Sequence, residues 1–275
     1  MSCPECFSGH KHTSDPQGRE EKIHGLDTYI AEPKDGKDAK GIIIIIPDAF
    51  GWQFVNNRIL ADHYAAAGDF LVYLPDFMEG SAAPEWLLVY VESVADTSSL
   101  SAWLTKPYAI AMLLYGAGPF MVRNRFGISY PTVQTFFQKI SENEGSKLPV
   151  GAAGFCWGGR HAIYLSHGEK SSSGKPLVNA SFTGHPSNCS FPAELQPVKQ
   201  PLSIALGDLD INLGPKQVKV IEDTFKTLEN VDTEIIMYPG AGHGFCIRAD
   251  PGREVIKQAE AAEKQAIDFF KKHFA

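Results

Sequence analysis

Short apolar runs alternate with amphipathic stretches along most of the chain. The five isoleucines at residues 42–46 predict a strand buried on both faces, because a half-buried strand alternates apolar and polar side chains. Similar patterns predict an edge strand at 24–31, further strands at 70–75, 150–154, 177–182, 202–206 and 233–238, and helices at 56–67, 132–144, 160–167, 215–229 and 254–273. Strands alternating with helices of this length predict an α/β fold with a mostly parallel twisted sheet, covered by helices on both faces.

Residues 78–131 interrupt this alternation with a long segment rich in Trp, Tyr, Leu and Met. Compact domains seldom contain structureless loops of that length, so we expect a helical insertion. The insertion could form a lid or a pocket wall at the carboxyl edge of the sheet, or it could lie far from any site. We therefore expect an N-terminal arm at residues 1–22, loosely held up to about Gln17, and a single domain at residues 23–275 that contains the insertion.

The composition and charge of the chain limit the classes of molecule that are expected as its partners. The 275 residues are 44% hydrophobic and 21% charged, which is typical of a globular protein. A net charge of −7 argues against nucleic acid or an anionic membrane surface as a partner. The N-terminus lacks the basic and apolar regions of a secretion signal, and no apolar run is long enough to span a bilayer. We expect a cytoplasmic monomer or homodimer.

A candidate nucleophile follows the predicted strand at 150–154. Residues 154–158 read Gly-Phe-Cys-Trp-Gly, the pattern of a nucleophile elbow with the thiol of Cys156 in place of a hydroxyl. Glycine tolerates the crowding of this sharp strand-to-helix turn, and the positive helix N-terminus favours a thiolate. The alternative is a structural cysteine in a glycine-rich junction.

Two later strand ends supply the groups that a cysteine nucleophile needs. Asp208 and Asp210 follow the strand at 202–206, and His243 lies in a glycine-rich loop after the strand at 233–238. A nucleophile needs a base to remove its proton, and the base needs an orienting acid. The order nucleophile, acid, base is that of α/β-hydrolases.

Taken together, these blocks resemble the dienelactone hydrolase family of the α/β-hydrolase superfamily, from about Ile23 onward. The resemblance implies the α/β-hydrolase fold, with Cys156 as nucleophile and His243 as base. It favours Asp210 over Asp208 as the triad acid, because the family places its acid at the fourth residue of the Gly-Asp-Leu-Asp turn.

The block Ile46-Pro-Asp-Ala-Phe-Gly-Trp52 also resembles a family segment that carries an acidic residue. That residue is typically a glutamate that contacts the resting cysteine and swings to help ionise it. Asp48 is one methylene shorter and could instead cap the following helix. The resemblance further implies that the backbone N–H groups of Ala49 and Trp157 form the oxyanion hole.

Arg248 follows His243 by five residues, and the resemblance implies that it binds a substrate carboxylate, for which a guanidinium is well suited. A solvated surface arginine is the alternative. Arg123 and Arg125 of the insertion are weaker candidates for this role. His185, in a Gly-His-Pro block, is expected to be structural.

The other four cysteines are given no catalytic role. Cys3 and Cys6 form a Cys-Pro-Glu-Cys motif near two histidines, but no second such pair completes a zinc site, so a solvent-facing thiol pair or a transient disulfide is favoured. Cys189 and Cys246 are expected to be packing residues.

The expected function is hydrolysis of a small ester or lactone through a Cys-Asp-His triad and a thioester intermediate, without a metal or organic cofactor. A thioesterase or a lactam-type hydrolase using the same site is an alternative. A catalytically silent family member that binds a small acid or a protein is another, favoured by Asp48 and by the long insertion.

Overall fold

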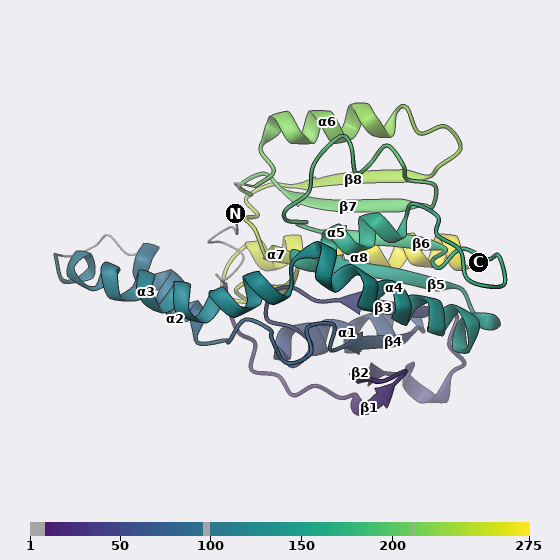
Figure 1. Ribbon diagram of the computed structural model, residues 1–275, viewed down its shortest axis with the longest axis horizontal. Helices are drawn as coiled ribbons and strands as arrows, with labels where there is room; N and C mark the ends of the chain where they lie inside the picture. The colour runs from purple at the N-terminus through teal and green to yellow at the C-terminus, as the bar shows by residue number, and fades with distance from the viewer. Residues whose placement is uncertain (1–8, 96–99, 211) are drawn as a thin grey trace.

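The computed structural model describes residues 9–95, 100–210 and 212–275. A single eight-stranded sheet runs through the molecule in the order β1-β2-β4-β3-β5-β6-β7-β8 (Figure 1). β2 is antiparallel to both β1 and β4, and all other neighbours are parallel. The strands are β1 Arg19–Ile23, β2 Leu26–Ala31, β3 Ile42–Ile46, β4 Leu71–Pro75, β5 Val150–Phe155, β6 Ala180–Gly184, β7 Leu202–Gly207 and β8 Thr233–Tyr238. The predicted mostly parallel sheet is confirmed.

Helices cover both faces of the sheet, as predicted. α1 and α8 pack against each other on one face, and α4 and α5 on the other (Figure 1). Two glycines of β5 let the helical layers on both faces approach the sheet closely. A Cβ at Gly151 would meet Phe270 of α8, and a Cβ at Gly154 would meet Ala162 of α5. These glycines are three apart, so they face opposite sides of the strand. The helices are α1 Val55–Gly68, α2 Leu87–Ala95, α3 Leu100–Arg123, α4 Phe126–Glu142, α5 Trp157–Leu165, α6 Pro215–Phe225, α7 Phe245–Arg248 and α8 Val255–Phe274.

The N-terminal edge of the sheet differs from the prediction. Residues 24–31 do not form the edge strand, because β2 lies between β1 and β4. β1 overlaps the segment predicted as an N-terminal arm, residues 1–22, and it pairs with β2 along its whole length. The short turn at His24 and Gly25, both with positive φ, joins the two strands and was not recognised from the sequence.

The described residues that precede β1 are also attached to the domain. The His10 N–H donates to the carbonyl of Arg248 at 3.0 Å, and the His12 N–H donates to Asn56 Oδ1 at 2.8 Å. Gln17 N–H donates to Asp62 Oδ2 at 2.7 Å. Residues 9–17, which were predicted to be loosely held, are thus hydrogen-bonded to the domain.

The insertion is helical, as expected. α2 and α3 pack together as a hairpin that projects from the domain (Figure 1). Pro107 and Pro119 lie inside α3, and Pro131 lies inside α4, which begins six residues earlier than the sequence suggested. Each proline removes one helical hydrogen bond, but packing of the surrounding turns maintains the helix. None of the helices in the described ranges combines the length and apolarity needed to cross a lipid bilayer.

Candidate active site

The predicted turn between strand and helix is present at Cys156. β5 ends at Phe155, α5 begins at Trp157, and Cys156 between them has φ 51° and ψ −109°. This positive φ is strained for a non-glycine residue. A Cβ at Gly158 would lie 2.1 Å from the carbonyl oxygen of Ile46, so only glycine fits there. The turn thus presents the thiol at the carboxyl end of the sheet.

Three loops that are distant in sequence bring the predicted trio together. His243 Nε2 lies 3.2 Å from the Cys156 sulfur, and His243 Nδ1 lies 2.8 Å from Asp210 Oδ2. All three side chains are buried. Asp208, the rejected acid, instead accepts a hydrogen bond from the N–H of Gly240 at the surface. The geometry is that of a nucleophile, a base and an orienting acid.

Within the trio, neighbouring groups shift the pKa values of His243 and Asp210. Burial lowers the pKa of His243, but the Cys156 sulfur and the hydrogen bond to Asp210 outweigh this effect and raise it to about 10. Burial raises the pKa of Asp210, but His243 outweighs that effect and the pKa is lowered overall. Asn212 assists, because its N–H donates to Asp210 Oδ1 at 2.9 Å. The arrangement therefore favours a charged imidazolium held by Asp210.

Asp48 and Arg248 form a buried ion pair beside this trio. Asp48 also accepts hydrogen bonds from Asn57 Nδ2 at 3.0 Å and from the Phe50 N–H at 3.2 Å. Burial raises the pKa of Asp48, the positive charge of Arg248 opposes this rise, and the Cys156 sulfur adds to it. Arg248 is thus not the solvated surface arginine of the alternative interpretation.

The two backbone donors expected for the oxyanion hole follow the ends of two strands. The N–H of Trp157 opens α5 and so has no acceptor within its helix. The N–H of Ala49 makes no backbone hydrogen bond among the described residues. Both amides are positioned on the loops after β5 and β3, which are neighbouring strands. Their role as oxyanion donors stays a prediction.

Two further polar side chains adjoin the thiol, and neither was predicted to act there. Ser187 Oγ lies 3.6 Å from the Cys156 sulfur, and the Ser187 N–H donates to the Cys156 carbonyl. His185 is fully buried, and burial lowers its pKa to about 4 against the opposing effect of Cys156. In the sequence both residues follow the strand predicted at 177–182, but only the sheet order places them near the thiol.

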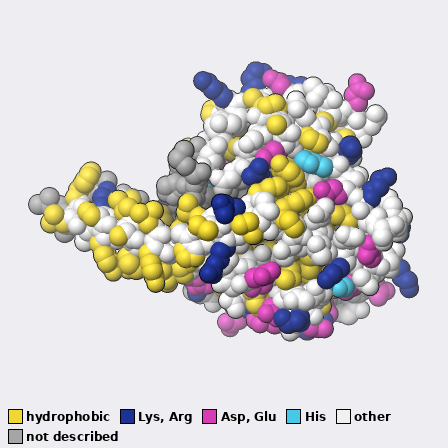
Figure 2. Space-filling view, in the orientation of Figure 1, with side chains coloured by type: hydrophobic (Ala, Val, Ile, Leu, Met, Phe, Trp, Pro, Cys, Tyr) yellow, Lys and Arg dark blue, Asp and Glu magenta, His cyan; other side chains and the backbone are white. Residues whose placement is uncertain are grey.

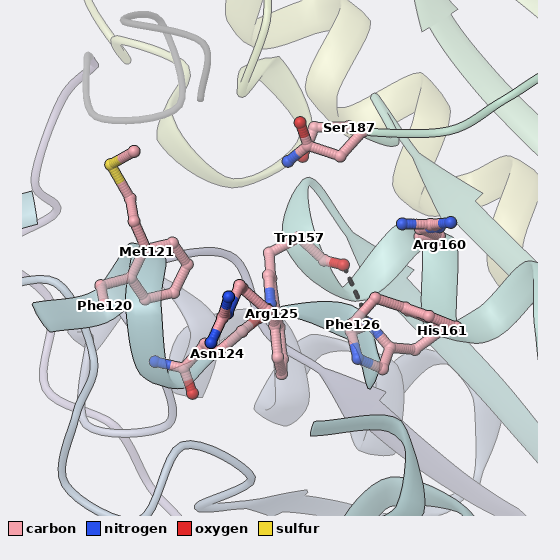
Figure 3. Close-up of a pocket in the computed structure, with 10 residues that line it drawn as sticks. Phe120, Met121, Asn124, Arg125, Phe126, Trp157, Arg160, His161 and Ser187 are labelled. Carbon is pink, nitrogen blue, oxygen red and sulfur yellow. Dashed lines mark hydrogen bonds between the residues drawn. The ribbon is translucent and has the colours of Figure 1, made fainter. Parts of the chain in front are cut away.

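A pocket of about 340 Å³ opens beside the elbow (Figure 3). Trp157 forms part of its wall, with Phe120 of α3 and His161 of α5 packed against its indole ring. Burial lowers the pKa of His161 to about 3, so this side chain stays neutral. Arg125 and Ser187 also line the pocket, whereas Arg123 is exposed and does not. The base of the insertion therefore contributes to the pocket wall.

The remaining cysteines lie apart from this trio. Cys189 is half-buried and donates to the carbonyl of Ser187 at 3.5 Å. Burial raises the pKa of both the Cys189 and the Cys246 thiol, as expected for packing residues. The motif at Cys3 and Cys6 lies outside the described residues.

Comparisons with known proteins agree with the fold and the motifs. The profile of the dienelactone hydrolase family matches residues 26–274. The hydrolase tropI of Talaromyces stipitatus is 26% identical, over 99% of this chain and 96% of its own length. The carboxymethylenebutenolidase homolog of Xenopus tropicalis is also 26% identical, over 98% of this chain and 96% of its own length.

A putative dienelactone hydrolase from Klebsiella pneumoniae subsp. pneumoniae has a similar structure, with a TM-score of 0.63 and 17% identity over 92% of this chain and 98% of that one. At this identity the likeness concerns the fold alone, and it confirms the α/β-hydrolase architecture. The family profile covers nearly the whole chain and confirms the expected enzyme class, a hydrolase of esters or lactones. The chain belongs to the dienelactone hydrolase family.

Proposed function

We propose that the protein hydrolyses small esters or lactones with Cys156 as the nucleophile, His243 as the base and Asp210 as the orienting acid. The observation that carries the proposal is the continuous hydrogen-bonded chain from sulfur to imidazole to carboxylate, with separations of 3.2 and 2.8 Å. Both distances are within reach for proton transfer. The intact trio also favours an enzyme over a silent binding protein.

The first half of the reaction forms a thioester. The Cys156 thiolate attacks the carbonyl carbon, and the resulting oxyanion accepts hydrogen bonds from the N–H groups of Ala49 and Trp157. The carbon–oxygen bond of the ester then breaks. His243 donates its Nε2 proton to the departing alkoxide, which leaves as an alcohol or, for a lactone, remains attached as a hydroxyl group.

The second half releases the acid. His243, now neutral, removes a proton from a water molecule that attacks the thioester carbon. The carbon–sulfur bond breaks, and the thiolate re-forms beside the imidazolium. Asp210 holds the imidazole through Nδ1 in both halves, so that Nε2 always faces the sulfur. The steps use only side chains and amides of the chain itself.

We also infer that Asp48 and Arg248 act together at this site. Asp48 is held by Arg248, by Asn57 and by the N–H of Phe50, so its short side chain is fixed. A fixed carboxylate favours a role in keeping Arg248 aimed at the site over a swinging role. A substrate carboxylate could then bind to the same guanidinium.

A cytoplasmic location and a monomeric or dimeric state remain predictions from the sequence.

Replacing the nucleophile tests the proposal directly. Cys156→Ala should lower the hydrolysis of a panel of p-nitrophenyl esters by about 10³-fold or more, because no thioester can form. Far-ultraviolet circular dichroism should be unchanged, since the thiol is small and the turn is set by its neighbours. Cys189→Ala, which removes a half-buried thiol outside the trio, should retain activity.

A chemical probe gives an independent measurement. Iodoacetamide near neutral pH should modify Cys156 before Cys189 and Cys246, because burial raises the pKa of those two thiols. Mass spectrometry of the digested protein would locate the label. Ester hydrolysis that survives in Cys156→Ala would disprove the assignment.

A further inference from the structure

His185 stands out because nothing in the proposed mechanism uses it. Both of its ring nitrogens are buried and make no hydrogen bond of normal geometry within the described residues, although one of them lies within 4.8 Å of the Cys156 sulfur. A buried polar group without a partner costs free energy, and native proteins seldom retain one without a reason. The ring is held by aromatic neighbours instead, with centroids 6.2 Å from Phe155 and 5.9 Å from Phe245. This packing leaves its nitrogens available to a ligand.

The ring also lies beside the catalytic pair. The centroids of His185 and His243 are 5.0 Å apart, in an edge-to-face arrangement. One ligand atom from each of Cys156, His185 and His243 can be chosen so that all three lie within 4.8 Å of one another. Zinc bonds of about 2.3 Å to sulfur and about 2.0 Å to nitrogen would place such atoms about 3.5 Å apart. Small side-chain rotations would therefore complete a tetrahedral arrangement.

We propose that Cys156, His185 and His243 form a zinc-binding site, and that occupancy of this site reversibly blocks hydrolysis. One thiolate and two imidazoles suit Zn²⁺ and Co²⁺, and a water molecule would take the fourth position. Asp210 already holds Nδ1 of His243, as carboxylates do for zinc-binding histidines. The ion would enter through the pocket at Ser187, whose Oγ is 3.6 Å from the sulfur.

The chemistry of binding is balanced without any further reactant. The proton shared by the thiol and imidazole of the resting pair leaves to solvent, while the sulfur and the two nitrogens each donate a lone pair to the ion. The sulfur then cannot attack a carbonyl, and His243 cannot accept a proton. A chelator reverses the process. Because a proton is released, zinc binding should strengthen as the pH rises.

The test compares the wild-type protein with His185→Gln and with a control, His167→Gln. His167 is a partly buried histidine that also packs on an aromatic ring, Tyr164, but lies outside the cluster. Titration of the metal-free protein with zinc chloride, followed by calorimetry, should show one site per chain. The zinc dissociation constant should rise by about tenfold or more in His185→Gln and stay unchanged in His167→Gln. Equal zinc affinity in all three proteins would overturn the proposal.

Two readouts keep this inference separate from the proposed function. X-ray absorption at the zinc edge of the zinc-loaded wild-type protein should show one sulfur and two imidazoles bound to the ion. This result depends neither on the hydrolysis of any ester nor on the folding of His185→Gln. A spectrum with fewer than two imidazoles would reject the site. Where hydrolysis is measured, each rate is divided by that variant's own zinc-free rate. Zinc should then inhibit His185→Gln only at about tenfold higher concentrations or more, and chelation with EDTA should restore the wild-type rate.

Discussion

The sheet-centred core and the α2–α3 hairpin contain similar apolar residues but use them differently. In the core, the side chains of Ile42–Ile46 are fully buried between two helical layers. In the hairpin, Leu104 is 74% exposed and Tyr115 is 75% exposed. Apolar side chains follow the projecting hairpin in Figure 2, in contrast to the mixed surface of the domain. Apolar side chains thus form a packed interior in one region and an exposed surface in the other.

The difference arises from what each region can pack against. A strand in the middle of a sheet is covered on both faces, so almost any apolar side chain in it becomes buried. A helical hairpin that projects from the domain buries only the residues between its two helices and at its base. Phe120, near the carboxyl end of α3, is 7% exposed because it reaches the pocket wall. Exposure therefore changes along one helix with distance from the domain.

The largest expected effect is on the core. Asp48→Asn should lower the free energy of unfolding by about 3–5 kcal/mol, because it removes the carboxylate that neutralises the buried guanidinium of Arg248. Urea unfolding followed by circular dichroism measures the change. The control is Asp223→Asn, whose partners Lys219 and Lys226 are exposed, and its effect should be far smaller because solvent screens exposed ion pairs. Equal losses would contradict the difference between buried and exposed charge pairs.

A second effect is the sensitivity of the core to acid. Burial lowers the pKa of His161 to about 3, so the unfolded chain binds a proton below pH 6.5 that the folded chain excludes. Proton uptake by His161 in the unfolded chain lowers the free energy of unfolding by up to about 1.4 kcal/mol for each unit by which the pH falls from 6.5 to 5. His161→Gln should remove that part of the slope, measured by urea unfolding at several pH values.

The control for this slope is His63→Gln. A hydrogen bond to Glu263 raises the pKa of His63, so its imidazole is charged in both states between pH 5 and 6. Its contribution to stability is present at low pH and is lost only as the pH rises past its folded pKa. The slope of His63→Gln should match that of the wild type, and an unchanged slope in His161→Gln would argue against a neutral buried imidazole.

The smallest effect is expected in the hairpin. Tyr115→Ser should change the free energy of unfolding by no more than about 0.5 kcal/mol, because most of the side chain is already in water. The matched variant in the core is Tyr64→Ser in α1, which removes a fully buried ring and should cost about 3–5 kcal/mol. Thermal unfolding of both variants compares the regions, and a large loss in Tyr115→Ser would show that the hairpin is buried in solution.

Local patterns predicted most of the regular elements. The strand at residues 233–238 was predicted with its observed bounds, and the strand at 202–206 to within one residue, because both are apolar runs bounded by turn residues. The strand expected at 177–182 begins only at Ala180. Leu177 and Val178 are buried without belonging to it, and burial alone does not distinguish a strand from the loop that precedes it. Helix α4 begins before Pro131, whereas the sequence predicts its start after this proline, because proline is more often found at a helix start than inside a helix.

The sequence by itself determined the order of the chemical groups: a thiol between two glycines, then an aspartate, then a histidine, each after an apolar run. These are local features, set by turn geometry and by the residues next to each group. Only the tertiary structure decided which groups meet. Parallel strands carry their carboxyl ends to one edge, where the loops of β5, β6, β7 and β8 converge. The neighbouring strand β6 thereby places His185 near the thiol, and no spacing along the chain could have predicted a contact that depends on the sheet order.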